Sequence, residues 1–171
     1  TKNKKLYWTE FGDGAPYGKV SRANYDGSQR ETLISIFNAI IKGLIVDIEN
    51  NEMFWTDCGF NKIQKSDLNG NHIIDIIPNE VSSPNSMDID RNTNEIIWSE
   101  IGGKKISKSF KDGSNIKPVI NTDINSPQDI VIYNLDLVSA KDLLAITLHV
   151  YPNPASKEIT IETDLPIDEI K

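Results

Sequence analysis

A short phrase of aromatic, β-branched and acidic residues occurs three times in this chain of 171 residues, at 6–10, 52–57 and 96–100. The three copies contain all three tryptophans of the chain, which are Trp8, Trp55 and Trp98. A glycine turn follows each copy, and the turn glycines Gly27, Gly70 and Gly113 stand at 43-residue intervals. A repeat of this length is typical of a four-stranded β-propeller blade. The sequence therefore predicts an all-β chain whose units bury each other's faces.

Runs of apolar, aromatic and β-branched residues within each unit predict its strands. The second unit is complete, with strands expected at 43–48, 52–57, 61–67 and 72–77. The third unit repeats it at 86–90, 95–100, 104–110 and 116–120, and the first shows three strands, at 5–10, 18–24 and 31–36. A fourth unit opens with a strand expected at 128–133, but Lys141 stands where its tryptophan should be. We therefore expect a partial propeller of about three antiparallel blades over residues 1–140.

Several other positions recur from unit to unit. Acidic residues close each copy of the phrase, at Glu10, Asp57 and Glu100, and we expect them to form structural hydrogen bonds because a catalytic site would break the symmetry of the repeat. The positions that we interpret as structural are Tyr7, Trp8, Asp26, Gly27, Asp47, Trp55, Asp57, Gly70, Asp90, Trp98 and Gly113.

Composition excludes some classes of function. A net charge of −7 and a pI of about 4.8 disfavour nucleic-acid binding, which needs Lys and Arg gathered on one face. No run of about 18 apolar residues is present, so we expect no membrane span. The single Cys58 cannot form an internal disulfide and is interpreted as a small hydrophobic residue.

No catalytic or metal-binding motif stands out in the 171 residues. The stretch 88–99 begins like a calcium loop, but it has Thr93 at the sixth position and Ser99 at the twelfth, where glycine and glutamate are needed. We therefore predict no catalytic residue, no metal and no cofactor.

The residues Tyr7–Glu10, Phe54–Asp57, Gly43–Asp47 and Lys19–Arg30 together resemble the YWTD repeat of low-density-lipoprotein-receptor class B β-propellers. The resemblance implies that blades close into a ring. About three units would leave two blade faces uncovered, which a second copy or blades encoded upstream would cover.

A second resemblance follows a short linker at 141–149. The phrase Tyr151, Pro152, Asn153 and Pro154, with the alternating Ile159–Ile161, resembles the start of the C-terminal sorting domain of type IX secretion cargo, a small β-sandwich. We expect residues 150–171 to be a truncated copy of it. The resemblance implies a bacterial protein that is secreted or held at the cell surface, with the type IX machinery as a partner.

The first unit breaks the regularity of the repeat between its predicted second and third strands, at 11–18. This insert carries Phe11, Asp13 and Tyr17, a composition suited to an amphipathic contact with a protein or a carbohydrate. We therefore predict a non-catalytic binding propeller with its ligand at this insert. The alternatives are an accessory region of a larger secreted enzyme, or a metal-dependent propeller lactonase or lyase.

Overall fold

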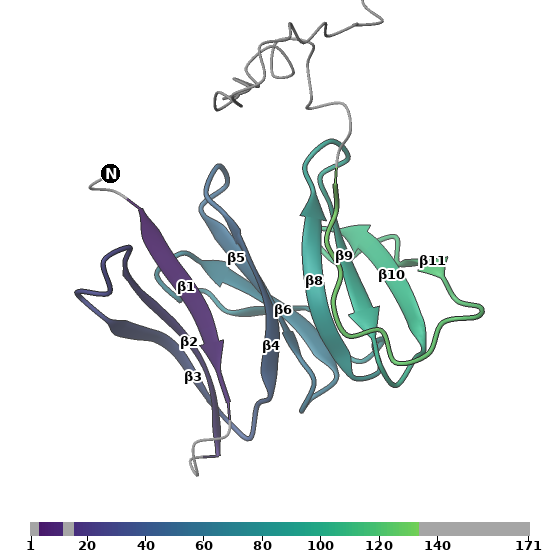
Figure 1. Cartoon of the computed structure of the whole chain (residues 1–171), viewed down its shortest axis with the longest axis horizontal. Helices are drawn as coiled ribbons and strands as arrows, with labels where there is room; N and C mark the ends of the chain where they lie inside the picture. Colours follow the sequence, from purple (N-terminus) through teal and green to yellow (C-terminus); the bar gives the residue numbers. More distant parts are fainter. Residues whose placement is uncertain (1–3, 12–15, 134–171) are drawn as a thin grey trace, which may run out of the picture. The chain divides into compact units, whose positions relative to one another are not determined.

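The computed structural model describes residues 4–11 and 16–133, and it places them in an all-β fold without a helix (Figure 1). The eleven strands are β1 (Lys5–Glu10), β2 (Tyr17–Asn24), β3 (Glu31–Phe37), β4 (Ile41–Asp47), β5 (Glu52–Asp57), β6 (Lys62–Asp67), β7 (Ile74–Ile77), β8 (Pro84–Asp90), β9 (Glu95–Glu100), β10 (Lys105–Phe110) and β11 (Lys117–Ile120). The predicted fold class is thereby confirmed.

The strands form three separate antiparallel sheets, and each sheet is a meander in chain order. The first blade contains β1 to β3, the second β4 to β7 and the third β8 to β11. Equivalent residues hold equivalent places in the ladders: Trp55 lies between Leu44 and Gln64, and Trp98 lies between Met87 and Ser107. The predicted strands are found with ends shifted by a few residues.

The strand expected at 128–133 is absent from the structure, so that prediction is wrong. The first strand of a complete blade forms its ladder with the second strand, as β4 does with β5, and residues 128–133 form no ladder with any strand among the described residues. The segment is instead attached to β8 by side chains. Asn85 donates to the carbonyl of Gln128, Ser86 donates to the carboxylate of Asp129, and the Ile132 amide donates to Asp88 Oδ2 at 2.8 Å.

Hydrophobic clusters pack each described blade against the next. Trp55 is fully buried in a cluster that includes Val20 and Ile34 of the first blade. Trp98 is fully buried in the equivalent cluster, which includes Phe54 and Ile63 of the second blade. Each of these tryptophans therefore packs against the preceding blade, as expected for units that cannot form a core alone.

The turn glycines explain why the repeat requires Gly at this position. All three have positive φ, 81° at Gly27, 81° at Gly70 and 84° at Gly113. A Cβ at Gly70 would lie 2.5 Å from the carbonyl oxygen of Leu33, and one at Gly113 would lie still closer to that of Ile76. The turn of each of these blades thus presses its backbone onto the outer strand of the preceding blade, where only glycine fits.

The threonine of the repeated phrase joins blades through one hydroxyl. Thr56 accepts a hydrogen bond from the Gly43 amide of its own blade at 2.8 Å and donates to the carbonyl of Asn85 in the next blade at 2.7 Å. Thr9 makes the same kind of contact, since its hydroxyl donates to the carbonyl of Lys42 at 3.0 Å. This side chain therefore holds the inner strands of consecutive blades together.

A buried ion pair also joins the second and third blades. The Lys111 ammonium lies 2.5 Å from Asp47 Oδ2, and the Asp47 side chain is only 1% exposed. Burial alone raises the pKa of Asp47, but the Lys111 ammonium and the side chain of Asn50 stabilise the carboxylate, and the pKa lies below its ordinary value of 3.8. The folded state therefore favours the charged form.

We expect this pair to make the stability of the protein depend on pH in acid. The unfolded chain protonates Asp47 near pH 3.8 and the folded protein only at lower pH, so the stabilisation is complete above 3.8 and is lost as pH falls through the folded pKa. Urea unfolding of Asp47→Asn between pH 7 and pH 2.5 should show a weaker loss of stability in acid than the wild type. The exposed Asp123→Asn is the matched control, and identical acid profiles for Asp47→Asn and the wild type would contradict the assignment.

Candidate functional site

An open cleft of about 510 Å³ lies where the inner strands of successive units begin, and we call it the inner cleft. Four segments line it: the end of β1 with Phe11, the start of β4, the start of β8, and the segment after residue 127. The lining residues are Thr9, Phe11, Ile41, Lys42, Gly43, Asn85, Ser86, Gln128 and Asp129. The last three segments hold equivalent places in their units, whereas the first unit contributes the end of β1, the strand equivalent to β5 and β9.

Several polar groups of the inner cleft already form hydrogen bonds with one another. The hydroxyl of Thr9, the amide of Asn85 and the hydroxyl of Ser86 all donate to groups of the next unit. Lys42 is exposed, and Phe11 presents 57% of its surface to solvent beside it. The inner cleft thus presents the exposed ammonium group of Lys42 and the ring of Phe11 next to polar lining residues.

The insert predicted to bind a ligand is described at its two ends. Its second end lies against the link between the first and second blades, because the Asn38 amide donates to the Pro16 carbonyl at 2.5 Å. Tyr17 is the first residue of β2 rather than part of the loop, and its ring meets that of Phe37 edge to face, with centroids 5.5 Å apart. Asp13 lies outside the described residues.

The structure brings Phe11 together with residues that sequence reasoning missed, namely Lys42, Asn85, Gln128 and Asp129. Tyr17 does not line the inner cleft. A signal for the missed residues was present, because Lys42, Asn85 and Gln128 follow one another at 43-residue intervals. This spacing did not lead to a predicted cleft, because polar residues at the start of a strand are not part of the apolar pattern from which strands and cores are predicted.

The recurring acidic residues serve backbone and side-chain donors. Asp57 Oδ1 accepts from the amides of Ile40, Gly59 and Phe60 at 2.9–3.1 Å. Glu100 accepts from the Trp98 indole at 3.0 Å. Hydrogen bonds from the Ser28 hydroxyl and amide lower the pKa of the exposed turn residue Asp26. Among residues 4–11 and 16–133 no group of three or more His, Cys, Asp or Glu side chains comes together as a metal site would require.

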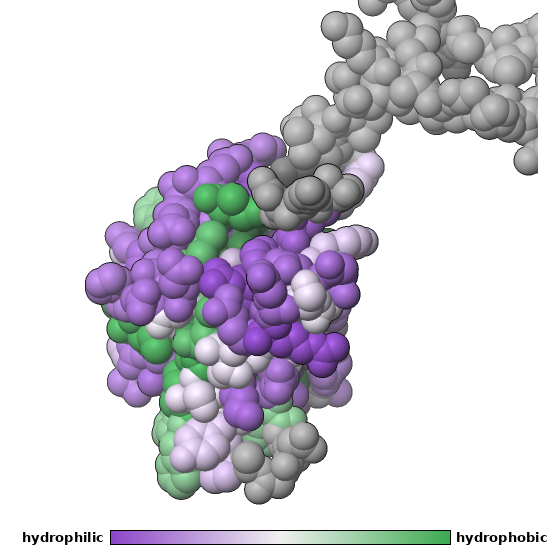
Figure 2. Space-filling view, turned by 90° about the vertical axis from the view of Figure 1, so that its left-hand side faces the viewer, coloured by the Kyte–Doolittle hydropathy of each residue, from purple (hydrophilic) through white to green (hydrophobic). Residues whose placement is uncertain are grey.

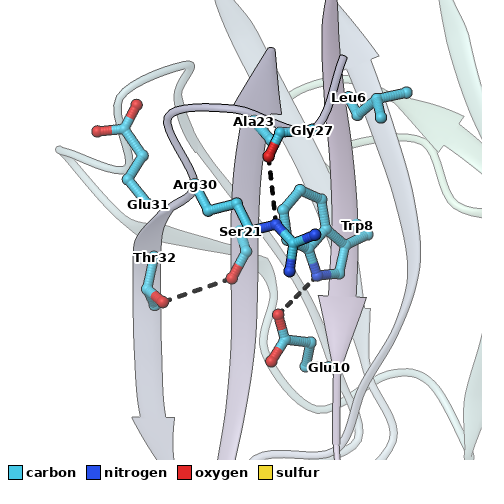
Figure 3. Close-up of a pocket in the computed structure, with 9 residues that line it drawn as sticks. All are labelled: Leu6, Trp8, Glu10, Ser21, Ala23, Gly27, Arg30, Glu31 and Thr32. Atoms are coloured by element: carbon cyan, nitrogen blue, oxygen red, sulfur yellow. Dashed lines mark hydrogen bonds between the residues drawn. The ribbon is translucent and has the colours of Figure 1, made fainter. Parts of the chain in front are cut away.

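A second hollow, of about 440 Å³, lies on the first blade and is shown in Figure 3. Trp8 and Arg30 lie side by side in it, with the Trp8 indole donating to Glu10 at 2.6 Å and Arg30 Nε donating to the carbonyl of Gly27 at 3.3 Å. The equivalence of the three tryptophans in the repeat predicts that Trp8, like Trp55 and Trp98, packs between blades. Among the described residues Trp8 is only half-buried and no blade precedes its own, so its packing against a preceding blade stays a prediction.

The remaining predicted positions have local roles. Tyr7 Oη accepts from Arg22 at 3.3 Å, and Asp90 Oδ1 accepts from the Asn92 amide at 2.9 Å. The proposed sorting residues Tyr151, Pro152, Asn153 and Pro154 lie outside the described part of the chain. Within the described part, no helix has the length and apolar character needed to cross a membrane.

Comparison with known proteins gives weak sequence matches over part of the chain. Nidogen-2 of mouse (Mus musculus) is 31% identical over 70 residues, which are 40% of this chain and 5% of nidogen-2. Low-density lipoprotein receptor-related protein 5 of mouse is 34% identical over 65 residues, which are 38% of this chain and 4% of that protein. No model of a known protein family matches the chain. The chain is thus weakly homologous to YWTD-repeat regions and spans only a small part of these relatives.

Solved structures extend the match to the fold. Nidogen in the crystal structure of a nidogen/laminin complex superposes with a TM-score of 0.62 at 22% identity, over 72% of this chain and 46% of that chain. A gluconolactonase from Xanthomonas campestris superposes equally well, with a TM-score of 0.62 at 13% identity, over 77% of this chain and 48% of the enzyme. The chain therefore spans less than half of each propeller. Because one neighbour is an enzyme and the other is seen in a protein complex, the fold does not decide the function.

Proposed function

We propose that this chain is part of a non-catalytic binding propeller that takes a protein or carbohydrate ligand in the inner cleft. The observation that carries the proposal is the position of Phe11, an exposed aromatic ring at the rim of a cleft that several successive units line. Aromatic side chains with one apolar face and adaptable polar neighbours are typical of recognition surfaces.

The chemistry of the inner cleft supports recognition over catalysis. Its ionisable lining residues are Lys42 and Asp129, and the Asp129 carboxylate already accepts from the hydroxyl of Ser86. A lactonase or lyase would need several convergent acid, base or metal-binding groups. Ring stacking on Phe11 and hydrogen bonds from Lys42 and Asn85 suit a sugar or a polar peptide segment. Nidogen, which matches the fold, is seen in complex with laminin, and this supports a protein ligand.

We expect Phe11→Ala to weaken ligand binding at least about tenfold while the melting temperature stays unchanged, because a rim aromatic contributes to binding and not to the core. Tyr17→Ala should weaken binding less, since its ring is engaged with Phe37. A glycan array and immobilised laminin serve as probes. Phe110→Ala is the matched control, since Phe110 is 45% exposed and lies at the opposite end of its blade, where β10 ends. Equal binding by Phe11→Ala and the wild type would contradict the proposal.

We further propose that the parent protein of this chain is exported by type IX secretion and acts outside the bacterial cell or on its surface. The resemblance of Tyr151–Pro154 and Ile159–Ile161 to the sorting signal supports this. In a bacterium with type IX machinery, deleting residues 150 onward from the parent should move the protein from the medium or cell surface to the periplasm. Fractionation and immunoblotting measure this, and unchanged export after the deletion would contradict it.

A further inference from the structure

We infer that a strip of exposed aromatic rings across the first two blades binds a neutral polysaccharide. The strip, which we call the aromatic strip, comprises Tyr17, Phe37 and Phe60. None of these three residues lines the inner cleft, so the aromatic strip is a separate site and does not depend on Phe11.

The backbone segments that carry the three rings lie side by side, at the end of the blades where β1 ends and β2 begins. The amide of Asn38, the residue after Phe37, donates to the carbonyl of Pro16. A Cβ added at Gly59 would lie 2.9 Å from the carbonyl oxygen of the same Asn38. The three rings therefore stand on neighbouring segments, and the aromatic strip crosses the boundary between the first and second blades.

All three rings are open to solvent. The exposed fractions are 40% for Tyr17, 57% for Phe37 and 46% for Phe60. The rings of Tyr17 and Phe37 meet edge to face, with centroids 5.5 Å apart, and this geometry leaves part of each ring surface available. Figure 2 views the first blade from the side and shows hydrophobic and weakly polar residues, in pale green and white, at its lower end, where β1 ends. The rings are therefore accessible to a ligand from solvent.

This exposure belongs to the position in the blade and not to an uncovered blade face. Phe60 holds the place of Tyr17 one unit later, and it is just as exposed although the first blade packs against its own blade. Glu80, which stands 43 residues after Phe37, is also exposed in the second blade. The aromatic strip therefore stays accessible when a blade lies on either side of it.

The aromatic strip also departs from the repeat. In the third unit, Gly103 holds the place of Phe60 and Asp123 that of Phe37. Residues that join the blades recur from unit to unit, as the turn glycines do, whereas the rings of the aromatic strip occur in the first two units and belong to neither hydrophobic cluster. We therefore expect these rings to serve binding on a rigid scaffold.

The charges beside the rings favour an uncharged ligand. The ammonium of Lys62 lies 5.3 Å from the centroid of the Phe60 ring. The same ammonium forms an ion pair with Asp75 at 3.2 Å, so its charge is already balanced within the blade. An acidic ligand would have to compete with Asp75 for this cation, whereas a neutral ligand leaves the ion pair intact.

A polysaccharide matches the chemistry of the aromatic strip better than a protein does. Its exposed large hydrophobic residues are all aromatic, without an aliphatic side chain to anchor an apolar protein surface. Aromatic rings stack on the apolar C–H faces of sugar rings, and a polysaccharide repeats such faces along its length. The exposed residues Asn38 and Asn61, which follow two of the rings, offer side-chain amides to the sugar hydroxyls.

Isothermal titration calorimetry of the whole chain with two soluble neutral sugars, cellohexaose and mannohexaose, tests the inference. At least one of the two should bind. Phe37→Ala and Phe60→Ala should each raise the dissociation constant of that sugar at least about tenfold. The melting temperature should stay unchanged, because both rings are exposed.

Tyr25→Ala is the matched control, since Tyr25 is 64% exposed but follows the end of β2, at the opposite end of the blade. It should bind the sugar as the wild type does. Failure of both hexasaccharides to bind would overturn the inference, as would tighter binding of an oligogalacturonate or of a proline-rich peptide. Binding that is lost in Phe11→Ala and kept in Phe60→Ala would place the sugar in the inner cleft, which would overturn the aromatic strip and support the proposed function.

Discussion

Replacing Trp55 by alanine is expected to lower the free energy of unfolding by about 3–5 kcal/mol. The side chain is 0% exposed and packs in the cluster that joins the first two blades. Its indole also donates to Gln64 Oε1 at 3.0 Å, so the change removes the donor to that buried oxygen. Urea unfolding followed by circular dichroism measures the loss.

The matched control is Trp8→Ala. Trp8 has the same place in its blade but is only half-buried, so its loss should cost clearly less than that of Trp55. A loss below about 1 kcal/mol for Trp55→Ala would contradict the placement of this tryptophan between blades.

Replacing Gly70 by alanine is expected to destabilise the protein by about 2–4 kcal/mol, which combines the cost of a left-handed backbone with that of overpacking. The residue has φ of 81°, and an added Cβ would lie 2.5 Å from the backbone oxygen of Leu33. A backbone atom in a paired strand cannot move aside as a flexible side chain could. The measurement is again urea unfolding.

Gly27→Ala separates the two causes, because Gly27 has the same φ of 81° but open space at its Cβ. Gly27→Ala should therefore cost only about 1–2 kcal/mol, the conformational part. Equal losses at Gly27 and Gly70 would show that the turn does not press on the preceding blade.

Most of the fold could be predicted from the sequence because the blade is a local unit. The tryptophans, the turn glycines and the alternating strands all repeat with the chain, and local pairing makes each sheet a meander. The sequence is least informative where a neighbouring blade or strand determines whether a residue is buried or paired. Trp8 has the sequence of its buried equivalents, but no blade among the described residues covers it. Residues 128–133 have the sequence of an inner strand but pair with no strand among the described residues.

The candidate site was predictable only in part. The insert of the first unit drew attention to Phe11 because it interrupts a regular repeat. The rest of the inner cleft comes from Lys42, Asn85 and Asp129, which lie on different units and meet only through packing between blades. Tyr17 was assigned to the loop, yet it extends β2 because its ring packs against Phe37 across the strand pair.

The central claim is that the second and third blades each bury their tryptophan against the blade before them. Hydrogen exchange of the three indole N–H groups, measured by NMR and assigned with single Trp→Phe variants, tests it directly. Two indoles, those of Trp55 and Trp98, should exchange far more slowly than that of Trp8, because they donate to Gln64 and Glu100 in sealed interfaces. Similar, rapid exchange at all three indoles would contradict the claim.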